Sequence, residues 1–250
     1  MRQLLACQAV FKIFLIDNSP TNALKTLAND NKIEYIFNNA NIGYGAAHNI
    51  AIQKVLTYSK YHIVLNPDVA FKNGTLEEIA SYMDSDTSTG LLMPKIIYPD
   101  GSLQYTCKLL PAPADLIFRR FLPTALIKQR MYRFEMLQSG YNKIIEVPYL
   151  SGCFMFLRVD ALKKVGLFDE RFFMYPEDID LTRRIHKYYK TIFYPYVTVT
   201  HVHERGSYKS IKLLFIHITN MIKYFNKWGW IFDKERKEVN EKIELQYNPK

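Results

Sequence analysis

In the stretch His62-Ile63-Val64-Leu65-Asn66-Pro67-Asp68, an apolar run stops at a polar tripeptide that ends in a carboxylate. Consecutive apolar residues without polar alternation are typical of a strand that is covered on both faces. Pro67 has no N–H to donate to a neighbouring strand, so the strand is expected to end before it. Asp68 would then lie just past the carboxyl end of a strand, where a carboxylate can bind a divalent cation. A simple turn explains Asn-Pro-Asp equally well, and this stretch alone does not decide between the two.

Predicted strands and helices alternate on both sides of this stretch. Before it, apolar runs predict strands at 11–16 and 33–37, with helices at 22–29 and 46–59. After it, we expect helices at 75–83, 160–165 and 179–189, and strands at 91–97, 102–107, 146–157, 191–194 and 197–201. Residues 111–143 are predicted to form a helical or loop insertion, because three prolines interrupt them. The alternating order favours an α/β protein with a Rossmann-like, mostly parallel sheet flanked by helices.

Composition places the chain among ordinary globular proteins. Its 250 residues, 48% of them hydrophobic and 23% charged, are enough for one large domain with a substantial core. The net charge of +9 favours anionic partners, although it also serves solubility, and no stacking motif or basic stripe points to nucleic acid. Three cysteines without metal-ligand spacing indicate a reducing compartment. No stretch reaches the length of a membrane span, and we recognise no signal peptide.

Four polar clusters follow predicted strands or begin predicted helices. They are Asp17-Asn18-Ser19, the segment 41–49, Asn66-Pro67-Asp68, and Glu177-Asp178. Polar groups that converge at one edge of a sheet indicate a ligand site rather than scattered turns. Gly43 and Gly45 would let the backbone approach a nucleotide closely at the start of a helix, although a plain loop explains two glycines as well.

The acidic and histidine clusters each have a functional and a structural interpretation. Glu177, Asp178 and Asp180 are favoured at a helix start by the helix dipole alone. A carboxylate buried among like charges, however, gains proton affinity, and this suits a general base. His201 follows a predicted strand and either caps it or completes the cation coordination that Asp68 begins.

Several motifs together resemble one known family. They are Ile16-Asp17-Asn18-Ser19, the run Asn41-Ile42-Gly43-Tyr44-Gly45-Ala46-Ala47-His48-Asn49, Leu65-Asn66-Pro67-Asp68, Ser151-Gly152-Cys153-Phe154-Met155, the run 166–173, Glu177-Asp178-Ile179-Asp180-Leu181, and His201 with Gly206-Ser207. In order and spacing over residues 11–210, the chain resembles the family-two glycosyltransferases of the GT-A fold, especially the bacterial rhamnosyltransferase-like branch.

The resemblance implies a role for each matching residue. Asp17 would meet the base of a nucleotide sugar, Asn18 and Ser19 would shape that pocket, and Asn41, Gly43, Asn49 and Asn66 would line the nucleotide side. Asp68 and His201 would hold Mg²⁺ or Mn²⁺ against the diphosphate, and Asp178 would be the catalytic base. Glu177, Gly152 and Arg205 are assigned to the acceptor side and the surroundings of the base.

Two features depart from the family pattern. Asn66 replaces the first aspartate of the metal motif, so cation binding would depend mostly on Asp68. The family also has a strand and helix ahead of the strand that ends at Asp17, and we expect that strand to be absent here. An inner strand would then lack a neighbour, and part of the nucleotide pocket would be unbuilt.

The C-terminal residues form a second predicted unit. We divide the chain into a glycosyltransferase domain, 1–207, and a basic amphipathic helical tail, 208–250, whose residues 233–250 are expected to be solvated or frayed. The tail is predicted either to lie on an anionic membrane or to pack on its own domain. The sequence thus predicts an inverting, metal-dependent glycosyltransferase of bacterial surface polysaccharide synthesis, cytoplasmic and peripheral at the inner face of the membrane. Its partners would be a nucleoside-diphosphate sugar and a glycan or polyprenyl-linked acceptor. The alternative is a non-catalytic nucleotide-sugar or glycan-binding module.

Overall fold

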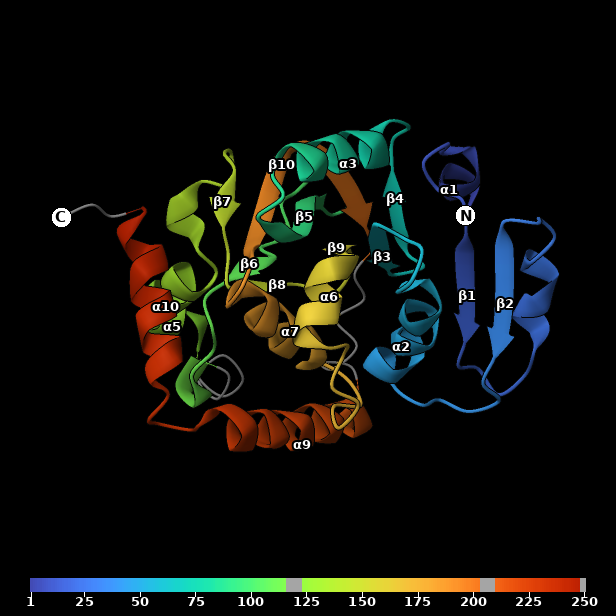
Figure 1. Cartoon of the computed structure of the whole chain (residues 1–250). Helices are drawn as coiled ribbons and strands as arrows, with labels where there is room; N and C mark the ends of the chain where they lie inside the picture. Colours follow the sequence, from blue (N-terminus) through green and yellow to red (C-terminus); the bar gives the residue numbers. More distant parts are fainter. Residues whose placement is uncertain (116–122, 203–209, 248–250) are drawn as a thin grey trace.

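The central sheet is covered by helices on both sides (Figure 1). The computed structural model describes residues 1–115, 123–202 and 210–247. In the sheet the strand order is β3, β9, β5, β10 and β4, with β7 joined to β10. The strands are β3 (Tyr61–Leu65), β9 (Phe154–Arg158), β5 (Thr89–Ile97), β10 (Lys190–His201), β4 (Val69–Phe71) and β7 (Ile145–Glu146).

The prediction of a mostly parallel sheet was wrong. Within the described part of this sheet, β5 and β10 run parallel, whereas β9 is antiparallel to both β3 and β5. β10 is also antiparallel to β4 and β7. β9 returns from late in the chain and inserts between two earlier strands, and the short strands β4 and β7 add the other antiparallel pairs. All five residues of β9 are buried, and a strand that is buried on both faces has the same pattern in either direction, so the pattern does not encode its orientation.

Two strands form a separate small sheet. β1 (Ile13–Asp17) and β2 (Ile33–Phe37) are parallel, as expected, and the short helix η1 (Ala23–Leu27) connects them. Among the described residues β1 pairs only with β2, and β3 pairs only with β9. Helix α2 (Tyr44–Val55) contacts both β1 and β3 and so links the two sheets, and the short helix α1 (Arg2–Ala6) lies near the N-terminus (Figure 1).

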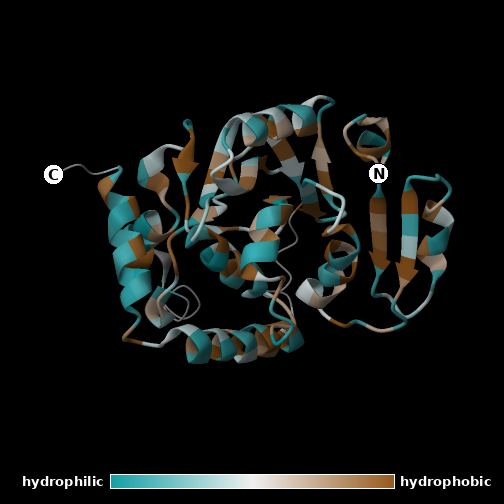
Figure 2. Cartoon of the chain, viewed as in Figure 1, coloured by the Kyte–Doolittle hydropathy of each residue, from teal (hydrophilic) through white to brown (hydrophobic). Residues whose placement is uncertain are grey.

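The helices that pack on the central sheet bury most of the core. α3 (Thr75–Ser85) lies on one side of the sheet, and α6 (Val159–Val165) and α7 (Glu177–His186) lie on the other (Figure 1). The apolar face of α3, which includes Ile79 and Met83, is fully buried, as are Leu91 and Leu92 of β5. Figure 2 shows the same division, with hydrophobic residues concentrated in the strands and hydrophilic residues on the outer helix faces. This rigid core holds the loops at the ends of β3 and β10.

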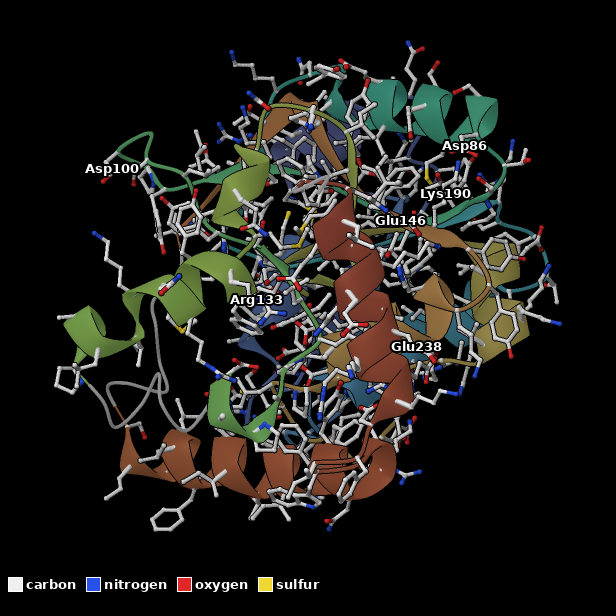
Figure 3. The ribbon with its side chains drawn as sticks, turned by 90° about the vertical axis from the view of Figure 1, so that its left-hand side faces the viewer. Asp86, Asp100, Arg133, Glu146, Lys190 and Glu238 are labelled. Atoms are coloured by element: carbon white, nitrogen blue, oxygen red, sulfur yellow. The ribbon has the colours of Figure 1, made fainter. Side chains whose placement is uncertain are left out.

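The C-terminal part of the chain folds into two helices. α9 (Ile211–Trp228) packs below α7, and α10 (Lys234–Leu245) stands beside α5 (Thr124–Phe134) (Figure 1). The expectation of a frayed segment after residue 232 was wrong, because α10 buries Ile243 in the main core. Figure 3 shows Arg133 of α5 next to α10, where its Nη2 donates to Glu244 Oε2 at 2.6 Å. The predicted domain boundary at 207/208 falls outside the described residues.

The remaining elements are short and connect α5 with the sheet. They are β6 (Cys107–Lys108), which pairs with β8 (Tyr149–Leu150), and the helix η2 (Leu137–Ser139). The predicted strand at 146–157 is therefore divided among β7, β8 and β9. In the described ranges, no helix has both the length and the apolar character that a membrane span requires.

Candidate active site

The turn after β3 brings Asp68 to the end of β10. The N–H of Asn66 donates to the carbonyl of Cys153 at 3.0 Å, and the turn closes when the Val69 N–H donates to the Asn66 carbonyl at 3.3 Å. The chain then enters β4, which pairs with β10 in a register that sets Val69 opposite His201. Backbone pairing therefore places the Asp68 carboxylate Oδ1 3.4 Å from Nε2 of His201.

Gln104 fixes the orientation of the His201 ring. Its side-chain amide donates to the His201 carbonyl at 2.7 Å, and its Oε1 lies 3.0 Å from Nδ1 of the same residue. Because an amide oxygen only accepts hydrogen bonds, Nδ1 carries a proton, and in the neutral ring Nε2 then presents its lone pair. The amide nitrogen of Asn66 lies 3.4 Å from Nε2, which agrees with this tautomer. Burial lowers the pKa of His201 and so favours the neutral ring, although the charge of Asp68 opposes this effect.

Asp68 and His201 supply two ligands that suit a divalent cation. A carboxylate oxygen and a neutral imidazole nitrogen are compatible with Mg²⁺ or Mn²⁺, and the nitrogen favours Mn²⁺. Within the described residues, no group of three His, Cys, Asp or Glu side chains is close enough to hold a metal ion by itself. The remaining coordination positions would therefore fall to phosphate oxygens and water, as is usual where such ions bind nucleotides.

Tyr44 joins this turn to the second half of the site. Its hydroxyl lies 2.7 Å from the carbonyl oxygen of Gly152 and 3.2 Å from Oδ1 of Asn66. Burial raises the pKa of Tyr44, and the negative charges of Glu177, Asp178 and Asp68 raise it further. The charges that act on this phenol come from the first turn of α7, which carries Glu177 and Asp178, and from the turn after β3, which carries Asp68.

Asp178 is a buried carboxylate in the first turn of α7. Its Oδ2 accepts the N–H of Gly152 at 2.8 Å, and its Oδ1 accepts the N–H of Ile179 at 2.7 Å. Burial raises its pKa from the ordinary 3.8 to about 6, whereas the two backbone N–H groups and the charge of Lys108 oppose this rise. Asp178 is therefore ionised at neutral pH but retains a high proton affinity, as a general base requires.

Glu177 is equally buried but has a different environment. Its Oε2 has no hydrogen-bond partner among the described residues. Burial raises its pKa, and the adjacent charge of Asp178 raises it further, whereas backbone hydrogen bonds from Glu177 and Tyr175 oppose this rise. Because Asp178 receives two backbone hydrogen bonds to its carboxylate and Glu177 Oε2 receives none, we assign the proton of this pair to Glu177 and the charge to Asp178.

The predicted nucleotide-side residues form one hydrogen-bonded group at the ends of β1 and β2. Asp17 accepts the Ser19 N–H at 2.9 Å and the Tyr35 hydroxyl at 2.6 Å. Asn18 accepts the side-chain amide of Asn38 at 2.8 Å and donates to the Gly43 carbonyl at 3.3 Å.

The Asn41–Gly43 turn is held to the same loop that precedes Asp178. Asn41 Oδ1 accepts the Gly43 N–H at 3.1 Å. Gly43 has φ +98°, and a Cβ there would come within 2.7 Å of the Phe173 carbonyl, so glycine is required for this close approach.

Two predicted site residues do not join these groups. Asn49 is buried and uses both ends of its amide on Phe168, whose N–H it accepts at 3.0 Å and to whose carbonyl it donates at 2.9 Å. It therefore fastens α2 to the loop before α7, and its predicted contact with the nucleotide stays a prediction. Arg205 lies outside the described residues.

The structure adds three residues that the sequence did not assign. Tyr44 lies within a recognised motif, but its spacing gives no sign that it bridges Asn66 and Gly152. Gln104 and Lys108 belong to a segment without any motif, and they reach the site only because of long-range pairing.

Two solved structures share the fold of this chain. GalNAc-T7 with UDP, GalNAc and Mn²⁺ is similar over 81% of this chain and 39% of its own, with a TM-score of 0.58 and 15% identity. The mannosyltransferase PcManGT from Pyrobaculum calidifontis, in complex with GDP-Man and Mn²⁺, is similar over 86% and 54%, with a TM-score of 0.55 and 13% identity. These likenesses identify the GT-A fold.

The sequence comparison then identifies the family. Residues 2–166 match the family model of glycosyl transferase family 2, and the chain belongs to this family. An N-acetylglucosaminyl-diphospho-decaprenol L-rhamnosyltransferase of Mycobacterium tuberculosis is 29% identical over 79% of this chain and 68% of its own length. The rhamnosyltransferase WbbL of Escherichia coli is 28% identical over 70% and 66%. The hexosyltransferase Agl10 of low-salt glycan biosynthesis in Haloferax volcanii is 25% identical over 70% of this chain and 53% of its own. The chain thus spans between about half and two thirds of the curated relatives it matches.

Proposed function

We propose that this chain is an inverting, divalent-metal-dependent glycosyltransferase of bacterial surface polysaccharide synthesis. It moves a sugar, rhamnose or another hexose, from a nucleoside-diphosphate sugar to a glycan or polyprenyl-linked acceptor. The carrying observation is that the Tyr44 hydroxyl bridges Gly152, whose N–H holds the Asp178 carboxylate, and Asn66, whose amide lies beside the Asp68–His201 pair. The two chemical tasks of sugar transfer, holding a diphosphate and receiving a proton, are thereby assigned to opposite sides of one site.

The residues on the donor side bind and orient the diphosphate. Asp68 and His201 would hold the cation, with Gln104 keeping the imidazole lone pair of Nε2 directed toward it. Bound there, Mg²⁺ or Mn²⁺ supplies positive charge against the negative charge that grows on the departing diphosphate. Asn66 brings no charge, so the carboxylate of Asp68 carries the electrostatic part of the attraction.

Asp178 receives the proton of the acceptor hydroxyl. As the hydroxyl oxygen forms its bond to the anomeric carbon, the bond from that carbon to the diphosphate oxygen breaks and its electron pair leaves with the diphosphate. The hydroxyl proton passes to the Asp178 carboxylate. Attack on the face opposite the leaving group inverts the anomeric centre in one displacement. The Gly152 and Ile179 N–H groups hold the carboxylate in place for this transfer.

The names of the relatives support a proposal for the acceptor and for the location of this chain. The name of the Mycobacterium tuberculosis relative includes a diphospho-decaprenol acceptor, and a lipid-linked acceptor would place this chain at the inner face of the cell membrane. The solved relatives hold UDP or GDP-mannose, so the donor base is left to experiment.

Replacement of Asp178 tests the proposal. Asp178→Asn is expected to lower transfer, followed as release of nucleoside diphosphate from UDP-, dTDP- and GDP-sugars with Mn²⁺, by at least about 10²-fold. Calorimetry should show unchanged donor affinity. Asp160→Asn, on the exposed face of α6, is the matched control and should leave both quantities unchanged. Wild-type transfer by Asp178→Asn would remove this residue from its role.

The same measurements decide between the enzyme and the binding-module alternative. The separate β1–β2 sheet and the neutral Asn66 are the features that favour a non-catalytic module. A chain that binds a nucleotide sugar in calorimetry but releases no diphosphate with any donor and Mn²⁺ would be such a module.

A further inference from the structure

Helix α9 has one buried face and one exposed apolar face. The buried face consists of Asn220, Met221, Tyr224 and Phe225, which pack in a small core with Phe172 and Ile179. The domain thus covers only part of this amphipathic helix, and the sequence-based alternative of a helix packed on its own domain accounts for that part alone.

Four large apolar side chains remain exposed on the opposite face. Ile211 is 75% exposed, Phe215 64%, and Ile218 and Ile222 41% each. Their spacing of three to four residues places them within roughly 60° of the helix circumference at 100° per residue. We call these four residues the α9 stripe. Exposed apolar residues are common singly, but a continuous row on one helix indicates an interaction surface.

The corner that follows α9 extends the apolar character. Ile231 is 78% exposed and Phe232 96%, and both lie between α9 and α10 (Figure 1). If this corner stayed in water, the apolar surface of both side chains would remain in contact with solvent, which is unfavourable.

The charges around the stripe have one sign. Residues 210–232 contain no Asp or Glu, whereas Lys212 and Lys223 follow the stripe along one side of the helix. The Lys223 Nζ donates to the Arg171 carbonyl at 2.9 Å, but this contact is exposed. Lysines along the flank of an apolar face can extend to phosphate groups while the stripe enters the acyl region. The absence of any acidic residue fits an anionic surface and would be unusual where α9 paired with a protein of mixed charge.

α9 is fixed rigidly to the element that carries the proposed base. Trp228 Nε1 donates to Asp180 Oδ1 at 2.8 Å, and Lys227 Nζ lies 2.6 Å from the same oxygen. Asn220 accepts the N–H of Phe173 at 3.2 Å, in the loop before α7. A surface that engages the stripe is therefore held at a fixed distance from Asp178.

We propose that the α9 stripe lies in the interface of an anionic phospholipid bilayer, with Lys212 and Lys223 at the level of the lipid phosphates. The proposal deepens the proposed function and rests on it for its purpose: a bilayer held against α9 presents a lipid-linked hydroxyl to a base fixed to the same helix. Membrane binding itself needs no turnover.

Vesicle flotation of the full chain tests the proposal. Vesicles of phosphatidylcholine with phosphatidylglycerol are expected to bind the chain, and phosphatidylcholine alone to bind it weakly. The variant Ile211→Ser/Phe215→Ser/Ile218→Ser should lose at least about tenfold in affinity for the anionic vesicles. Lys212→Gln/Lys223→Gln should also bind more weakly, and its residual binding should depend less on salt.

Matched controls separate this result from misfolding and from failure of the enzyme proposal. Leu126→Ser removes a side chain that is 75% exposed on α5 and should bind vesicles like wild type. Because the stripe is exposed, the triple variant should keep the wild-type melting temperature and nucleotide-sugar affinity. Equal flotation of wild type and triple variant, or a wild-type dimer that the triple variant converts to monomer without vesicle binding, would overturn the proposal. Vesicle binding by a chain that transfers no sugar would leave it standing and remove only the enzymatic function.

Discussion

The backbone N–H of Gly152 donates to Oδ2 of Asp178 at 2.8 Å, so the loop before β9 determines where the proposed base points. A Cβ on residue 152 would lie 3.2 Å from the Asp178 Cβ and 3.4 Å from the accepting oxygen. The first distance is shorter than an ordinary contact, so the Asp178 side chain would have to move by a few tenths of an ångström. The relationship ties glycine at this position to the orientation of the base.

We therefore expect Gly152→Ala to slow catalysis without preventing donor binding. A displaced base should lower kcat roughly tenfold, since small misplacements of reacting groups have large effects on rate. KM for the donor should stay near wild type because the Asp68–His201 side is unaffected. Steady-state kinetics would measure both, and a rise in donor KM at constant kcat would show that Gly152 acts on the nucleotide instead.

The raised pKa of Asp178 predicts a pH dependence of transfer. The base acts only when ionised, so kcat/KM should fall as the pH drops through about 6. For an aspartate with the ordinary pKa of 3.8, activity would persist to much lower pH. The profile should be measured between pH 4.5 and 8, with donor affinity followed by calorimetry as the control. A flat profile between pH 5 and 7 would contradict the assignment.

The protonated state of Glu177 predicts a different pH effect, on stability. Its pKa is higher in the folded protein than the ordinary 4.5, so the folded chain keeps a proton that the unfolded chain releases. This contribution is fully present below pH 4.5 and is lost as the pH rises toward the folded pKa. Glu177→Gln, which keeps the shape without titrating, should therefore lose less stability than wild type between pH 5 and 8.

Thermal melting across this pH range measures the difference. At pH 8 the Gln variant should melt at a higher temperature than wild type. The difference should be about 2–4 °C for each kcal/mol of unfolding free energy that wild type loses because of the Glu177 proton. Glu238→Gln, on the exposed surface of α10, is the control and should melt like wild type at every pH. A Gln variant whose melting temperature follows that of wild type at all pH values would show that Glu177 is ionised in the folded state.

The local sequence pattern predicted the positions of helices and strands and proposed the candidate carboxylates of the site. It did not predict how the elements of the central sheet pair in space. The runs at 33–37 and 75–83 correspond to β2 and α3, because local apolar patterns determine both. The direction of β9 was not predicted, because the apolar pattern of a buried strand is the same whether the strand is parallel or antiparallel to its neighbours. Gln104 and Tyr44 were missed because their partners lie 97 and 108 residues away, and only the folded sheet brings them together.

Gln104 offers a test of the donor side that does not require turnover. Gln104→Leu removes the acceptor that holds the His201 proton on Nδ1, so Nε2 would carry the proton in part of the molecules. Loss of such a supporting contact typically lowers metal affinity by about 10- to 100-fold. Titration with Mn²⁺, followed by electron paramagnetic resonance of the free ion, would measure this. Gln138→Leu on η2 is the control, and equal Mn²⁺ affinity in both variants would exclude His201 as a ligand oriented by Gln104.

Two tryptophans at the end of α9 allow the anchoring of α7 to be tested with matched substitutions. Trp228 donates its indole N–H to the fully buried Asp180, and the Arg183 guanidinium lies 4.0 Å from its ring centroid. Trp230 donates to Asn226 at the same distance of 2.8 Å, but it does so at the surface. The two hydrogen bonds have similar lengths and different surroundings.

Trp228→Phe should destabilise the protein much more than Trp230→Phe. Without the indole donor the buried Asp180 keeps Arg184 and Lys227 but loses one hydrogen bond, which costs about 1–3 kcal/mol where no water can replace it. At Trp230 water replaces the lost donor, and the change should stay within about 0.5 kcal/mol. Urea unfolding would measure both, and kcat should fall only for Trp228→Phe, because Asp178 lies on the same helix turn as Asp180. Equal stability of the two variants would mean that α9 does not hold α7 through the Trp228–Asp180 hydrogen bond.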